Sequence, residues 1–203
     1  MKDCILASGS PRRREILTNL GVRFEVVTPN VDETSNERDP ERLSELLARR
    51  KGEAALQLFA GKEAELRDKL LIASDTTVAV DGMILGKPKD AADACRMLRL
   101  LSGRTHRVVS GIFLACNGKT AVSHEVTQVD FAPMTKSEIA WYVASGEPFG
   151  KAGGYAIQGL ASLWIREIRG DYFNVVGLPV HRMQALCRET FGEPFPASGG
   201  QGR

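Results

Sequence analysis

Apolar and β-branched residues come in short runs along the chain, and polar or glycine-containing turns separate several of these runs. Runs of this kind are typical of buried or half-buried strands. The strands predicted in this way cover residues 4–7, 24–27, 70–73, 78–80, 83–85, 105–116, 120–131 and 163–169. Asp81-Gly82 and Asn117-Gly118 favour type I′ turns, so the strands that flank each dipeptide are expected to form antiparallel hairpins.

Helix start and stop signals lie between these runs. A capping residue followed by proline occurs at Ser10-Pro11 and again at Asp39-Pro40, and Thr135 with Glu138 forms a capping box. The predicted helices run from Pro11 to Gly21, Pro40 to Gly61, Asp90 to Ser102, Thr135 to Ser145 and from Pro179 through Leu186.

The predicted helix over 40–61 has one unusual feature. Its apolar face is formed by Leu43, Leu46, Leu47, Ala54, Ala55 and Leu58. Lys51 lies four residues after Leu47 and four before Ala55, so it falls on the apolar face. A lysine in this position must either extend its ammonium group to solvent or meet an anion.

The alternation of elements predicts one mixed α/β domain over residues 1–191, with a largely antiparallel sheet and flanking helices. Neither an internal repeat nor a linker divides these residues. From residue 192 onward, Gly, Pro, Ser, Ala and Gln dominate without periodicity, which predicts a flexible tail over 192–203.

Composition and charge exclude several classes of protein. The 203 residues are 43% hydrophobic and carry a net charge of +2, which is ordinary for a globular protein and gives no overall attraction for nucleic acid. No apolar run approaches the roughly 20 residues that span a membrane, and no secretory leader is recognisable. The four cysteines are widely spaced and form no CxxC motif, so we expect reduced thiols in a cytoplasmic protein.

The segment Ser8–Arg14 predicts an anion site. A strand that turns through Gly9 into a capped helix directs free N–H groups toward a ligand, and Arg12 and Arg13 add bidentate donors for phosphate oxygens. The alternative is a solvated arginine cluster, but cations are unfavourable at a helix N-terminus. A bound anion therefore explains the sequence better.

Four other charged residues are candidates for chemistry, each with a plainer alternative. Asp75 follows an apolar strand among hydroxyl residues, where it would hold a metal, accept a proton or simply form an Asx turn. Lys51 lies on a predicted apolar face, so an anionic partner for its ammonium group is expected. Lys87 and Glu33 lie in polar loops, where such residues are usually only solvated.

Histidines and glycines give weaker signals. His106, His124 and His181 have no metal-site spacing, and His106 is expected at the surface or in a cross-strand pair. The glycine cluster at 150–154 lacks the spacer and the Lys-Ser/Thr pair of a P-loop.

Together these segments resemble the Maf family of nucleoside triphosphate pyrophosphatases over about residues 4–190. The matching motifs are LASGSPRR at 6–13, SDTTV at 74–78, GKP at 86–88, LSGRTH at 101–106 and GKAGGYAIQG at 150–159. The resemblance implies an elongated mixed α/β fold related to inosine triphosphate pyrophosphatase, usually as a homodimer. It also implies hydrolysis of a nucleoside triphosphate to the monophosphate and pyrophosphate with a divalent cation, Mg²⁺ or Mn²⁺.

The resemblance also assigns roles to individual residues. Asp75 would be the proton acceptor, and Glu33 would help Asp75 to hold the metal. The phosphates would be bound by Ser8, Arg12, Arg13, Lys51 and Lys87. The combination Arg12, Thr76 and Gln158 is similar to that of the branch acting on dTTP and UTP, although Ser74 stands where that branch often has Ala or Gly.

Three other functions stay open at this point. The family has been linked with septum formation, so a regulatory partner in cell division is an alternative to catalysis. A nucleic-acid-binding module that uses Arg12–Arg14 is disfavoured by the low net charge and the 6% aromatic content. Within the enzyme class, modified pyrimidine nucleotides such as pseudo-UTP or 5-methyl-UTP are further candidate substrates.

Overall fold

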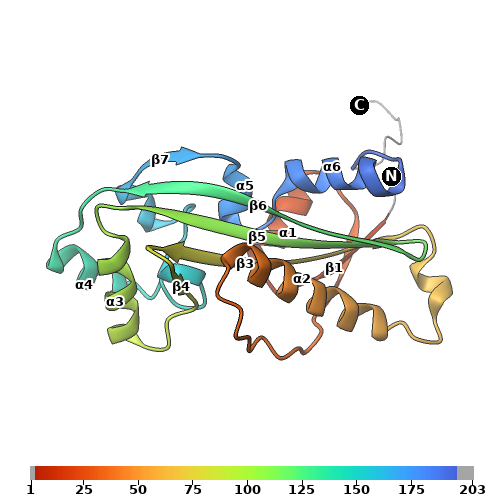
Figure 1. Cartoon of the computed structure of the whole chain (residues 1–203), viewed down its shortest axis with the longest axis horizontal. Helices are drawn as coiled ribbons and strands as arrows, with labels where there is room; N and C mark the ends of the chain where they lie inside the picture. The colour runs from red at the N-terminus through yellow and green to blue at the C-terminus, as the bar shows by residue number, and fades with distance from the viewer. Residues whose placement is uncertain (1–2, 196–203) are drawn as a thin grey trace.

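A twisted seven-stranded mixed sheet organises the computed structural model, which describes residues 3–195 (Figure 1). The strands are β1 (Cys4–Ala7), β2 (Phe24–Val27), β3 (Leu70–Val80), β4 (Met83–Leu85), β5 (Thr105–Cys116), β6 (Lys119–Phe131) and β7 (Ile165–Arg169). Their order is β2-β1-β3-β5-β6-β7, and β4 pairs with β3. β1 is parallel to β2 and β3, whereas the other pairs are antiparallel. The predicted fold class is confirmed.

Helices cover both faces of this sheet. They are α1 (Pro11–Asn19), α2 (Pro40–Gln57), α3 (Ala91–Leu101), α4 (Lys136–Ala144), α5 (Tyr172–Val176) and α6 (Val180–Phe191), with 3-10 turns η1 (Glu63–Leu66), η2 (Ala152–Gly154) and η3 (Leu160–Trp164). Figure 1 shows α2 on one face and α5 and α6 on the other, with α3 and α4 at one end of the long strands. No helix in residues 3–195 is long and apolar enough to cross a membrane.

The core has two parts because neighbouring residues of a strand face opposite sides of the sheet. Along β1, Leu6 belongs to the larger apolar cluster, whereas Ile5 belongs to the smaller cluster on the α2 side. The predicted caps of α2 and α4 are present: Asp39 accepts from the N–H groups of Glu41 and Arg42, and Thr135 with Glu138 closes a capping box.

α2 packs against the sheet through smaller residues than predicted. Its buried positions are Ser44, Leu47, Ala48, Gly52 and Ala55, whereas Leu58 from the predicted apolar face is 55% exposed. A Cβ on Gly111 of β5 would lie 2.1 Å from the Ser44 carbonyl oxygen, and one on Gly52 would lie 2.0 Å from the Phe113 ring. Both glycines are therefore needed for the close approach that brings Lys51 to β3.

Several predicted boundaries are wrong. The predicted strands at 70–73 and 78–80 are a single strand, β3, so Asp75 lies inside a strand and not beyond its end. The sequence did not predict η1, η2, η3 or α5, and α6 continues to Phe191. Phe195 is 5% exposed and packs in the larger cluster, so packing extends past residue 191. The rest of the predicted tail, 196–203, lies outside the described residues, and the domain boundary stays a prediction.

Candidate active site

A cleft lies beside a break in the strand pairing of β3. Residues 70–72 of β3 pair with β1, and residues 78–80 pair with β4. Among the described strands, none pairs with residues 73–77 on that same edge, although their other edge pairs with β5. A cleft of about 840 Å³ opens at this gap.

All the residues that sequence analysis proposed for the site line this one cleft. They are Ser8, Arg12, Arg13, Glu33, Lys51, Asp75, Thr76, Lys87 and Gln158. They come from the β1–α1 turn, the first turn of α1, the loop before α2, α2 itself, β3, the turn after β4 and the loop before η3. The structure therefore brings together residues that are up to 150 positions apart in the chain.

Charged side chains alternate in sign across the cleft. The Lys51 ammonium lies 2.5 Å from Asp75 Oδ1 and 2.8 Å from Glu33 Oε1, and Lys87 Nζ lies 3.9 Å from Glu33 Oε2. Lys51 and Asp75 are largely buried, whereas Lys87 is exposed. Partial burial raises the pKa of Glu33, but the hydrogen bond and charge of Lys51 outweigh it, so the pKa falls below its usual value.

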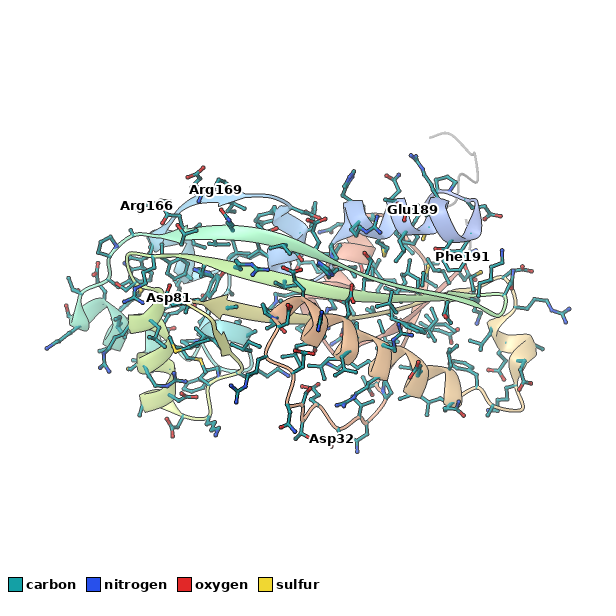
Figure 2. The ribbon with its side chains drawn as sticks, in the orientation of Figure 1. Asp32, Asp81, Arg166, Arg169, Glu189 and Phe191 are labelled. Atoms are coloured by element: carbon teal, nitrogen blue, oxygen red, sulfur yellow. The ribbon has the colours of Figure 1, made fainter. Side chains whose placement is uncertain are left out.

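The loop that carries Glu33 is fixed from both sides. Arg50 of α2 donates from Nη1 to the carbonyl oxygens of Asp32, at 3.0 Å, and Thr34, at 2.8 Å. The Asp32 carboxylate in turn accepts from the N–H and hydroxyl of Thr34. Figure 2 shows Asp32 on the outer part of this loop, away from the sheet. Because both neighbours are held in this way, Glu33 is oriented toward Lys51.

The three consecutive arginines of α1 have different environments. Arg13 is buried and donates to Gly177 O at 2.7 Å, Ser8 Oγ at 2.9 Å and Thr76 Oγ1 at 3.2 Å. Burial lowers the pKa of the Arg13 guanidinium, and the negative charge of Asp75 opposes that effect. Arg13 thus holds Ser8 and Thr76 in place and puts a fixed positive charge behind the cleft.

Arg12 is half-buried in the cleft wall, whereas Arg14 is exposed. No hydrogen bond joins the Arg12 guanidinium to another described residue, so its donors are available to a ligand. Burial lowers the pKa of Arg12, and the charge of Glu147 opposes this shift. Of the three arginines, Arg12 is the one best placed to bind an anion directly.

A buried polar network beneath the cleft was not predicted. Ser110 Oγ lies 2.8 Å from Thr76 Oγ1 and donates to the Asn174 carbonyl oxygen at 2.9 Å. The Asn174 side chain accepts from Ser110 N–H and donates to Val108 O and Thr127 Oγ1. A polar residue inside the apolar run Asn174-Val175-Val176 was the signal that could have revealed it.

The glycine-dense segment shapes one wall of the cleft. Gly153 has φ = +69° and donates its N–H to Gly86 O at 3.0 Å, which ties this segment to the turn that carries Lys87. A Cβ on Gly153 would lie 2.9 Å from Val78, so a larger residue would be strained there as well as crowded. Gln158 is exposed on this wall and forms no hydrogen bond with another described residue.

Of the two positions expected for His106, the surface position is wrong and the cross-strand position is confirmed, because His106 lies opposite Val129 of β6 and its ring contacts Phe131 of that strand. The side chain is 1% exposed, and its Nε2 lies 2.8 Å from the Tyr155 hydroxyl within a cluster of rings that includes Phe131. Nδ1 has no hydrogen-bond partner among residues 3–195. Burial lowers the pKa of His106 to about 4, although the charge of Asp130 opposes this shift. The imidazole is therefore neutral at pH 7.

The donor set at the cleft suits a divalent cation with few protein ligands. In residues 3–195, no group of three or more His, Cys, Asp or Glu side chains could hold a metal. Glu33 and Asp75 nevertheless lie on either side of the Lys51 ammonium. Mg²⁺ is commonly bound by one or two carboxylates together with substrate phosphates and water. The residues present therefore fit such an ion only when a phosphate ligand completes its shell.

Comparison with known proteins identifies the family. The family model described as "Maf-like protein" matches residues 3–190. The chain belongs to the Maf-like protein family. A relative from Symbiobacterium thermophilum named dTTP/UTP pyrophosphatase is 46% identical over 200 residues, covering 98% of this chain and 99% of the relative. A second of that name, from Chromobacterium violaceum, is 45% identical and covers 94% of this chain and 96% of its own length.

Among solved structures, the Maf-like chain is similar to the Ham1 protein of Staphylococcus aureus. The TM-score is 0.43 at 19% identity, over 64% of this chain and 72% of the other. The chemistry available to the Maf-like site follows from its own side chains. Its lysines and arginines can neutralise a polyanion, while Asp75 and Glu33 can accept a proton or ligate a cation.

Proposed function

We propose that this Maf-like protein is a nucleoside triphosphate pyrophosphatase that hydrolyses dTTP and UTP to the monophosphate and pyrophosphate. The observation that carries the proposal is the single cleft in which Arg12, Lys51 and Lys87 surround Asp75 and Glu33. The substrate pair is supported by the names of the relatives, which are similar over nearly the full chain.

Phosphate binding follows from charge. A triphosphate carries about four negative charges, and attack on the α-phosphorus requires that they be neutralised. Arg12 has free donors, and Lys87 extends from an exposed turn. Both side chains can therefore bind the β- and γ-phosphates. Ser8, whose hydroxyl accepts from Arg13, would contribute a hydrogen bond at the start of α1.

Asp75 would accept the proton of the attacking water. Its Oδ1 is occupied by Lys51, whereas no described residue donates to Oδ2, which is therefore free to face water. Water adds to the α-phosphorus, the bond from that phosphorus to the bridging oxygen breaks, and pyrophosphate leaves with the bonding electrons. The water's proton passes to Asp75. The Lys51 ammonium would hold the Asp75 carboxylate through Oδ1 during attack.

A divalent cation, Mg²⁺ or Mn²⁺, would be held by Glu33 and Asp75 together with the phosphates. When bound, such an ion neutralises phosphate charge and polarises the phosphoryl oxygens. Both carboxylates now contact Lys51, so the lysine must share them with the ion.

Base recognition would come from Gln158, because its amide has both a donor and an acceptor for the carbonyl and N–H edge of uracil or thymine. Thr76 is already hydrogen-bonded to Arg13 and Ser110, so its contribution would be to fix Arg13 and not to contact the base. One methyl group is worth only about 1–3 kcal/mol, so weak discrimination between dTTP and UTP is expected.

A single assay tests the proposal. Pyrophosphate release is measured from dTTP, UTP, CTP, ATP, GTP, pseudo-UTP and 5-methyl-UTP, with Mg²⁺, with Mn²⁺ and with neither. Preferred turnover of the uracil and thymine nucleotides with metal is expected. Absence of release from every triphosphate would refute the proposed activity. A homodimeric assembly stays a prediction from the family resemblance, and a cytoplasmic location stays a prediction from the cysteine pattern.

A further inference from the structure

Glu147 is a carboxylate in the wall of a cleft that otherwise suits phosphate. It lines the cleft together with Arg12, Lys151 and Gln158. A negative charge in this position repels a triphosphate and therefore weakens its binding. Neither proton transfer nor metal binding, as derived above, uses Glu147, so its presence needs another explanation.

The contacts of the carboxylate supply one. Glu147 Oε1 accepts from the Tyr142 hydroxyl at 2.8 Å and from the Ala161 N–H at 3.3 Å. Oε2 accepts from the Leu160 N–H at 2.9 Å. These two N–H groups begin the η3 turn, directly after Gln158 and Gly159. The carboxylate thus binds the main chain of the turn that presents Gln158.

Gly159 shows how closely this turn surrounds the carboxylate. A Cβ on Gly159 would lie 2.3 Å from Glu147 Oε2. The backbone of Gly159 has φ = −111°, which other residues also adopt, so glycine is required here for space and not for conformation. The turn and the carboxylate therefore fit together as one unit.

The main chain of Glu147 is also held by hydrogen bonds. Lys151 donates from Nζ to the Glu147 carbonyl oxygen at 2.5 Å, and the Glu147 N–H donates to Ser145 Oγ at 3.2 Å. Burial raises the pKa of Tyr142, and the hydrogen bond to Glu147 raises it further. The hydroxyl therefore stays protonated and remains a donor near neutral pH. Glu147 consequently joins the end of α4 to the wall that carries Gln158.

We propose that Glu147 is a positioning residue for nucleobase recognition, which holds the turn at 158–161 so that Gln158 faces the base. This inference rests on the proposed function. It predicts two opposite effects of neutralising Glu147: discrimination between bases falls, while attraction for the phosphates rises. A residue with a merely structural role would not produce that combination.

Glu147→Gln is the first variant, because one oxygen becomes an NH₂ group that cannot accept a hydrogen bond from a main-chain N–H. We expect the ratio of kcat/KM for dTTP over CTP to fall about tenfold, the size of one misplaced hydrogen bond. We also expect inorganic tripolyphosphate, which has no base, to inhibit about two- to threefold more tightly because a repelling charge is lost.

Gly159→Ala separates the two effects. It displaces the turn from the carboxylate but keeps the charge, so discrimination should fall while tripolyphosphate inhibition stays at the wild-type level. Tyr142→Phe removes only one donor to Glu147 and should cost about threefold in discrimination. The matched control is Glu167→Gln, an exposed carboxylate on β7 paired with Arg169, which should change neither quantity.

Wild-type turnover is measured first, so that failure of the proposed activity is recognised separately. Given an active, selective wild type, a Glu147→Gln variant that keeps the wild-type dTTP-to-CTP ratio would overturn the positioning role. Thermal unfolding of each variant identifies loss of fold. If Glu147→Gln does not fold, unchanged discrimination in Tyr142→Phe together with Gly159→Ala overturns the inference instead.

Discussion

Lowering the pH from 8 to 5 is expected to weaken the fold through His106. This imidazole is neutral and buried among Phe131 and Tyr155, and its pKa is lowered from 6.5 to about 4. In the unfolded chain the same side chain is solvated and takes up a proton at the ordinary value. Between the two values the unfolded state binds more protons than the folded state, so stability falls with falling pH.

The size of the effect follows from the two pKa values. At pH 8 both states are neutral and the contribution is close to zero. At pH 5 the unfolded state is almost fully protonated and the folded state is not, which amounts to about 2 kcal/mol of lost stability. Full protonation of both states below pH 4 would bring the loss to about 3 kcal/mol.

Urea unfolding of the wild type and of His106→Leu at pH 8, 6.5 and 5 measures this contribution. His106→Leu leaves the Tyr155 hydroxyl without its partner, so the variant is expected to be less stable at pH 8. The informative quantity is therefore the pH dependence: between pH 8 and 5 the wild type should lose about 2 kcal/mol more than the variant. Equal losses would refute the reasoning, because carboxylates titrate alike in both proteins.

Four further outcomes are expected. Asp75→Asn should lower kcat about 100- to 10,000-fold and retain triphosphate binding in calorimetry; full turnover would remove Asp75 from its catalytic role. Gln158→Ala should reduce pyrimidine selectivity more than turnover, which an unchanged ratio across the nucleotide panel would contradict. Gly111→Ala should cost about 2 kcal/mol and lower the Tm by roughly 6 °C, since the added Cβ meets the Ser44 carbonyl; an unaltered Tm would show that α2 can shift. Chelation by EDTA should stop pyrophosphate release and Mg²⁺ or Mn²⁺ should restore it, whereas full activity in EDTA would exclude the proposed ion.

Local patterns were sufficient for much of the fold. Hairpin dipeptides and caps act between neighbours in sequence, so the long β5–β6 hairpin and the starts of α2 and α4 were predicted. β3 was divided in error because Ser74, Asp75, Thr76 and Thr77 form a polar run inside it. Their partners, such as Gly177 and Lys51, lie far away in the sequence, and no local pattern reveals them.

For the candidate site too, local patterns predicted which residues take part but not the contacts that each one makes. Residue types and spacing identified the cleft-lining residues, but they could not distinguish the roles of Arg12, Arg13 and Arg14. Only the tertiary contacts show that Arg13 is enclosed by protein acceptors while Arg12 keeps its donors free. The burial of His106 was missed for a related reason, since its apolar neighbours come from β6 and from residue 155.

The unpaired edge of β3 at residues 73–77 offers a ligand contacts that most side-chain substitutions do not remove. Alternate residues of 73–77 direct main-chain N–H and C=O groups toward the gap, where a nucleotide and not another strand can lie beside them. Such contacts belong to the backbone, so substitutions other than proline leave the main-chain N–H and C=O groups in place. The open edge is also only five residues long, and short edges are one way in which proteins limit pairing with foreign strands.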